Sequence, residues 1–217
     1  MREDEKPAAQ GPATREHLLA VALRLFAEHG IAQVSNRRVA LEAGTGNNYA
    51  VGYHFGSRRG LIKEILGRHQ AAVEPLRAAR LAQARRTGEA GDYVGGLILP
   101  LTEHLAALPV PTFYARFVQQ ALADPDASAL CHASNNASPS VTEIRGWLRE
   151  NTEDLAPAVL AARSRLITLL ATHTCAQHEA ELHHGSPRAF DSWQEVGAFL
   201  TASVTGLLAP PRRAACA

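Results

Sequence analysis

The stretch SNRRVALEAGTGNNYAVGYHFGSRRGL, residues 35–61, contains two short helical segments separated by a glycine-rich turn. Ser35 is a good N-cap for a helix over residues 36–43, and Gly44 is a typical residue for ending that helix. A second short segment covers residues 47–55 and is predicted to be helical. Two short helices joined by such a turn are typical of a helix-turn-helix, whose second helix enters the major groove of DNA.

The residues before and after this stretch complete a three-helix unit. Thr14 is predicted to cap a helix over residues 14–29, and Gly30 ends it. One face of that helix is apolar at a spacing of three to four residues. This face comprises Leu18, Ala22, Leu25 and Phe26. On the other side, Ser57 caps a long helix that starts at Arg58.

The second short segment presents polar and aromatic side chains that are suited to DNA. Asparagine bonds an adenine edge in bidentate fashion, while tyrosine and histidine reach phosphates or thymine methyl groups. The candidates for these contacts are Asn47, Asn48, Tyr49, Tyr53 and His54. The candidates for neutralising phosphates are Arg37, Arg38, Arg58 and Lys63. Asn47 and Asn48 are equally suited to forming the turn, and Tyr53 to a place in the core.

The charge of the chain is unevenly distributed. Residues 12–70 carry eight basic and four acidic residues, a net charge of +4, whereas residues 71–217 carry 12 basic and 14 acidic residues, a net charge of −2. A basic head on a slightly acidic body fits a polyanionic partner for the head alone.

Three spaced blocks carry a resemblance to a known family. They are Leu18-Leu19-x-x-Ala22-x-x-Leu25-Phe26-x-x-x-Gly30, Val39-Ala40-x-x-Ala43-Gly44, and Tyr53-His54-Phe55-Gly56-Ser57-Arg58-x-x-Leu61. Over these blocks the chain resembles the TetR family of bacterial transcriptional regulators. The resemblance implies a homodimer that binds palindromic double-stranded operator DNA, with a small-molecule effector in the C-terminal half controlling release. Repression is the family's commoner mode, and activation stays open.

One departure from the family pattern falls in the recognition segment. The interval from Ala43 to His54 is one residue longer than in typical members. The chain resembles a subgroup in which Asn-Asn-x-Ala-Val-x precedes Tyr-His-Phe-Gly, here residues 47–56. The resemblance therefore transfers less directly to Asn47, Asn48 and Tyr49 than to the residues that follow.

Helical periodicity continues through the rest of the chain and predicts an all-α protein of about nine helices. We expect a disordered lead-in over 1–13, a helix-turn-helix domain over 14–56, an effector-binding and dimerisation domain over 57–209, and a flexible tail over 210–217. The long helix is predicted to run to about residue 86, with bends at Gly67 or Pro75. Later helices are predicted over 92–108, 112–123, 140–154, 157–184 and 188–208. Residues 125–139, rich in Ser, Asn and Pro, are predicted to form a loop.

Two sets of residues in the C-terminal body are candidates for binding. Ligand pockets are typically apolar with a few polar groups, and the middle helices supply Tyr93, His104, Phe113, Arg116, Phe117 and Trp147 as candidate ligand residues. The last two helices are candidates for a four-helix dimer interface, through Leu160, Ile167, Leu170, Trp193, Gly197, Leu200 and Val204. For both sets, packing inside the core is the competing interpretation.

Other classes of protein fit the sequence less well. The run from His178 to His184 has Leu182 where the metalloprotease motif needs a second histidine, and no other catalytic motif stands out. Cys175 and His178 are one turn apart, but a polar helix face explains them better than a metal site. We expect no enzyme activity, no cofactor, no membrane partner and a cytoplasmic location. The main alternative is a small-molecule-binding helical protein whose DNA head has degenerated.

Overall fold

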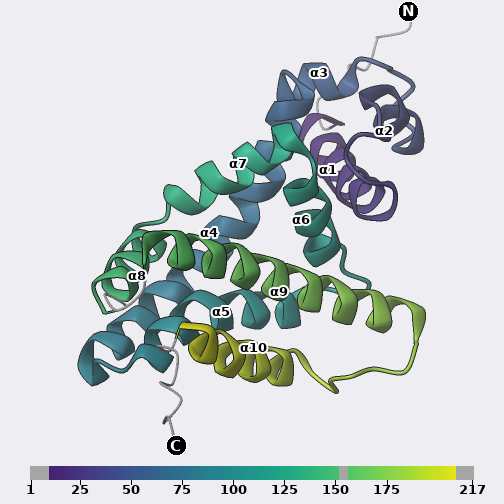
Figure 1. Ribbon diagram of the computed structural model, residues 1–217. Coiled ribbons are helices and arrows are strands. Elements are labelled where there is room, and N and C mark those ends of the chain that lie inside the picture. Colours follow the sequence, from purple (N-terminus) through teal and green to yellow (C-terminus); the bar gives the residue numbers. More distant parts are fainter. Residues whose placement is uncertain (1–9, 152–155, 209–217) are drawn as a thin grey trace, which may run out of the picture.

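Ten helices make up the regular structure of a computed structural model that describes residues 10–151 and 156–208 (Figure 1). Within these ranges there is no strand, and the predicted all-α class is confirmed. The helices are α1 (Gln10–His29), α2 (Asn36–Glu42), α3 (Ala50–Phe55), α4 (Arg58–Thr87), α5 (Ala90–Ala107), α6 (Tyr114–Ala123), α7 (Pro125–Asn136), α8 (Pro139–Glu150), α9 (Pro157–His184) and α10 (Trp193–Leu208). No helix in the described part is long and apolar enough to cross a membrane.

The head consists of α1, α2, α3 and the first turns of α4, which gather at one end of the molecule (Figure 1). All four residues of the predicted apolar face of α1 are buried. The Ser35 hydroxyl accepts a hydrogen bond from the Arg38 amide at 3.1 Å, and the Ser57 hydroxyl accepts one from the Gly60 amide at 3.0 Å. Both predicted caps are therefore confirmed, and they fix where α2 and α4 begin.

Two long helix–helix contacts organise the body, one between α5 and α10 and one between α4 and α5. Helices α5 and α10 pack along each other, and Gly197 lies where they approach most closely. A Cβ atom at Gly197 would lie 2.6 Å from Thr102 Oγ1 and 2.9 Å from Leu99 Cδ2. Helix α4 continues as one helix through Gly67 and Pro75 and packs against α5, so it belongs to both head and body.

Helix α6 joins the two parts of the molecule. It packs against α1 in the head and against α9 in the body (Figure 1). The rings of Phe26 on α1 and Phe117 on α6 are 6.2 Å apart, and both side chains are almost fully buried. A single apolar core therefore runs from Leu18 in the head to Val204 on α10.

One predicted loop is wrong. Residues 125–136 form α7, and the signals that favoured a loop are those of a helix start. The Asp124 carboxylate accepts hydrogen bonds from the amides of Asp126 at 3.1 Å and Ala127 at 2.9 Å. Pro125 takes the first position of the helix, where its missing N–H costs nothing.

Several predicted boundaries also move. Helix α1 begins at Gln10 and not at Thr14, so residues 10–13 of the predicted lead-in are helical. The last helix begins at Trp193, five residues later than predicted. Residues 1–9 of the lead-in and the predicted tail at 210–217 lie outside the described residues.

Candidate DNA-binding site

The turn before α3 is built by polar side chains. Asn47 Oδ1 accepts a hydrogen bond from the Tyr49 amide at 2.9 Å, while the Thr45 hydroxyl donates to the carbonyl oxygens of Ala40 and Asn47, both at 3.1 Å. Helix α3 therefore begins at Ala50, and residues 47–49 precede it, contrary to the prediction. Because Asn47 uses its carbonyl oxygen in the turn, it is not free for a bidentate adenine contact.

The outer face of the turn and of α3 carries two tyrosines that are almost fully exposed. Tyr49 is 83% and Tyr53 82% exposed, so Tyr53 does not belong to the core. The ring of His54 meets that of Tyr53 edge to face at 4.9 Å. Asn48 is exposed as well. Large aromatic side chains left in water on a helix-turn-helix form a surface suited to a partner.

The predicted basic residues differ in how available they are. Arg37 and Lys63 are exposed. Arg38 is held by Glu42, 3.1 Å from its Nε, and by the His29 ring, 2.8 Å from its Nη2. Arg37 and Lys63 are therefore the freer cations for phosphate contacts, and Arg38 must first leave its ion pair.

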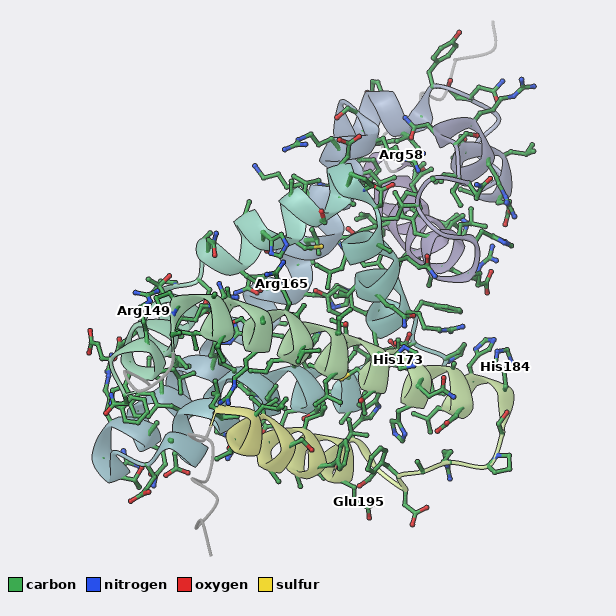
Figure 2. All side chains as sticks on the ribbon, viewed as in Figure 1. Arg58, Arg149, Arg165, His173, His184 and Glu195 are labelled. Atoms are coloured by element: carbon green, nitrogen blue, oxygen red, sulfur yellow. The ribbon has the colours of Figure 1, made fainter. Side chains whose placement is uncertain are left out.

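Arg58 has a structural position in the head. Its Nη1 donates to the carbonyl oxygen of Val34, and its guanidinium lies 5.4 Å from the centre of the Phe26 ring. Burial lowers the pKa of Arg58, and the nearby carboxylate of Asp124 opposes that shift. Figure 2 shows Arg58 among the helices of the head. A direct phosphate contact by this residue stays a prediction, and its visible role is to join the start of α4 to the α1–α2 loop.

This head matches a known family. Residues 18–65 match the family described as bacterial regulatory proteins, tetR family. The head is therefore a helix-turn-helix DNA-binding domain of the TetR family. This family consists of transcriptional regulators.

The other comparisons add little to this assignment. The chain is similar to a transcriptional regulator from Rhodococcus sp. Rha1 of known crystal structure, at 22% sequence identity and a TM-score of 0.35, covering 89% of this chain and 95% of that one. The chain matches no curated protein. The family assignment therefore comes from residues 18–65.

The body of the chain contains a cavity of about 240 Å³ between α4, α5, α6, α7, α8 and α9. None of the six residues predicted to contact a ligand lines it. Tyr93 and Trp147 stack on each other, with ring centres 3.9 Å apart. Phe117 packs against Phe26 in the shared core.

The other three predicted ligand residues are held by partners within the chain. His104 Nε2 lies 2.7 Å from His69 Nδ1, and burial lowers the pKa of both rings, that of His69 to about 3. Arg116 pairs with Glu179, and its guanidinium lies 5.0 Å from the centre of the Phe113 ring. The sequence placed His104 and Arg116 in the correct helices, whereas Phe113 is the N-cap of α6 and lies just outside that helix. The sequence could not show which neighbours these residues contact.

The predicted dimer residues divide into two groups. Trp193, Gly197, Leu200 and Val204 are buried inside one subunit, against α5 and its neighbours, and are therefore not available to a partner. The remaining three, Leu160, Ile167 and Leu170 on α9, are half-buried.

Sequence reasoning missed three residues that the structure makes prominent. Glu179 is a buried carboxylate on α9, Arg77 is a buried cation on α4, and Gly60 lies where α4 starts against the end of α3. Cys175 and His178 are both buried, so the prediction of an exposed polar face there is wrong, and burial raises the pKa of Cys175 to about 12. Over residues 10–151 and 156–208, no three His, Cys, Asp or Glu side chains are grouped so that they could hold a metal ion.

Proposed function

We propose that this protein is a repressor that binds a palindromic operator as a homodimer in the cytoplasm. A small-molecule effector entering the body would release it from the DNA. The observation that carries the proposal is the exposed surface formed by the turn and α3, with Tyr49 and Tyr53 pointing away from the core. Exposure of such large aromatic side chains to water is unfavourable, and it is typical of a surface that a partner covers.

Helix α4 supports a coupling between effector and DNA. Its first turn holds Gly60 against the carbonyl of Phe55 at the end of α3, and further along it Arg77 lines the cavity. The proposed boundary between the two domains, at residue 57, coincides with the start of this helix. A ligand that shifts α4 would therefore shift α3 as well, and an operator would bind only one of the two arrangements.

Replacing Tyr53 by alanine tests the proposed DNA surface. We expect about 10- to 100-fold weaker binding to the DNA upstream of the protein's own gene, measured by mobility shift at low salt. The thermal unfolding of the variant should stay unchanged, because the side chain is 82% exposed. Tyr53→Phe distinguishes a hydroxyl–phosphate bond from contact with a thymine methyl group, since only the former is lost.

A control is Val110→Ala, which truncates another exposed side chain, 74% exposed, in the loop between α5 and α6. Its affinity should equal that of the unmodified protein. Equal affinity of Tyr53→Ala and Val110→Ala would rule out the proposed surface. No specific complex at any salt concentration, together with stabilisation by a ligand, would favour the alternative of a binding protein with a degenerate head.

The dimer is proposed to form through the exposed face of α9 and α10. Three large apolar side chains on α9 are exposed, Val159, Leu166 and Leu169, and Phe199 on α10 is exposed as well. Figure 2 labels Arg165 and His173 along α9, so polar groups are available for the rim of an interface. These exposed residues replace the four buried ones as candidates for contact with a second copy.

Replacing Leu169 by glutamate should dissociate the dimer. The side chain is 64% exposed, and in a two-fold interface the change occurs twice. We expect at least a tenfold rise in the dimer dissociation constant, measured by sedimentation equilibrium. Leu41→Glu on α2, where the leucine is 72% exposed, should leave the oligomeric state unchanged. A dimer that tolerates Leu169→Glu must use another face.

A further inference from the structure

The cavity in the body is apolar over most of its wall and basic at two points. Its apolar residues come mainly from α5, α6 and α9, including Leu97, Leu101, Leu105, Val118 and Ile167. Two arginines also line it, Arg77 from α4 and Arg145 from α8. None of the described residues that line it is Asp or Glu.

Arg77 is buried without sufficient partners. The residue is 6% exposed, and its Nε makes no hydrogen bond within the described part of the chain. Among the residues that the structure describes, its ion pair joins Nη1 to Glu74 Oε2 at 3.2 Å. A buried guanidinium carries five N–H donors, and leaving them unpaired is costly.

Glu74 does not satisfy Arg77 because it serves several other donors. Its carboxylate accepts hydrogen bonds from the Ser138 hydroxyl at 2.5 Å, the Ser140 amide at 3.1 Å and the Gln70 side chain at 3.2 Å. These bonds tie α4 to the start of α8. The carboxylate of Glu74 therefore divides its hydrogen bonds between Arg77 and these other donors, two of which lie at the start of α8.

The other charged and polar groups of the cavity also favour an anion. Arg145 is close enough to repel Arg77 and so contributes to lowering the pKa of Arg77, for which burial is the larger cause. The phenol of Tyr114, also in the cavity wall, lies within electrostatic range of Arg77. Two arginines around one space, with a single shared carboxylate nearby, leave the site short of negative charge.

We propose that this cavity binds a small carboxylate with an apolar body, whose carboxylate pairs with Arg77 while its ring or chain lies against the leucines of α5. The inference rests on the proposed function, since it names the chemical class of the effector. A cavity of about 150 Å³ accommodates benzene, so the space here, about 240 Å³, suits one substituted ring or a short alkyl chain. A neutral ligand of the same shape would leave Arg77 Nε without a charged partner.

The test is calorimetric titration of the full chain, without DNA, with benzoate, phenylacetate and hexanoate. Each carboxylate is paired with its primary amide, which has the same shape but no charge. We expect at least one carboxylate to bind, and to bind at least tenfold more tightly than its amide. Equal binding of acid and amide, or no binding by any of the three acids, would overturn the proposal.

Substitutions at two arginines test which side chain causes the preference for the acid over the amide. Arg77→Met should remove the preference for the acid over the amide, whereas Arg80→Met, one turn further along α4 and paired with Glu103 at the surface, should preserve it. If Arg77→Met does not fold, Arg77→Lys keeps the charge without the fork of donors and should weaken the acid alone. Retention of the full preference in a folded Arg77 variant would contradict the assignment.

The two proposals fail in different ways. Operator binding by the ligand-free protein is measured by mobility shift and does not depend on which compound enters the cavity. If the operator binds and the carboxylates do not, the effector class is wrong while the DNA-binding role stands. If carboxylates bind through Arg77 but no operator does, the site exists in a protein that does not act on DNA.

Discussion

Replacing Glu179 by alanine is expected to lower the free energy of unfolding by about 3–5 kcal/mol, the usual cost of removing one partner from a buried ion pair. Glu179 is 1% exposed and holds the start of α6 from its place on α9. Its carboxylate accepts hydrogen bonds from the amides of Ala115 at 3.0 Å and Arg116 at 2.9 Å, and pairs with Arg116 Nε at 3.2 Å. Alanine would leave all of these donors buried without an acceptor.

Chemical denaturation followed by circular dichroism measures this loss. Glu181→Ala, on the same helix, removes a carboxylate that accepts a hydrogen bond from the Gln177 side chain at 2.9 Å and should change stability by no more than about 0.5 kcal/mol. Glu179→Gln keeps the shape and one acceptor oxygen and should give an intermediate loss. A loss for Glu179→Ala no larger than that for Glu181→Ala would show that the ion pair does not anchor α6.

The second large effect is expected from Gly60→Ala at the start of α4. A Cβ atom there would overlap the carbonyl oxygen of Phe55 and lie 3.2 Å from its carbonyl carbon, and backbone atoms cannot move aside as a flexible side chain can. We expect a loss of about 1–3 kcal/mol, typical of overpacking. Because Phe55 is the last residue of α3, the shift should also weaken operator binding.

Gly67→Ala is the matched control on the same helix. A Cβ atom at Gly67 meets nothing within 4 Å, so alanine should stabilise α4 by about 0.5–1 kcal/mol and leave DNA affinity unchanged. Thermal unfolding and mobility shift on both variants separate the two glycines. If Gly60→Ala proves as stable as Gly67→Ala, then α3 and α4 do not meet as closely as described.

Local signals in the sequence predicted the head well. The caps at Ser35 and Ser57 and the apolar face of α1 are properties of neighbouring residues, so they are visible without knowledge of the fold. The same kind of signal was misread at Asp124-Pro125, where an N-cap followed by proline starts α7. The Ser, Asn and Pro content of residues 125–139 favours a loop, but the N-cap at Asp124 starts a helix there.

Contacts between distant residues were not predictable in this way. Arg116 and Glu179 are 63 positions apart, and nothing in the sequence near either one indicates the other. The periodicity of α10 identified its apolar face correctly but not what covers that face, which is α5 of the same subunit. The recognition segment was predictable only in part. Its sequence allows Asn47 either to form the turn or to contact DNA, and the structure shows the turn.

The shared core between α1 and α6 restricts how this regulator can be rebuilt. Phe26 meets Phe117 across the junction, and the Gln120 amide oxygen lies 3.1 Å from the position that a Cβ atom would take at Gly30. A head transplanted from another regulator would have to match the α6 surface as well as the sequence after residue 57. If the proposed DNA surface is right, we expect operator specificity to be exchanged more readily by substituting Asn48, Tyr49 and Tyr53 in place than by swapping whole domains.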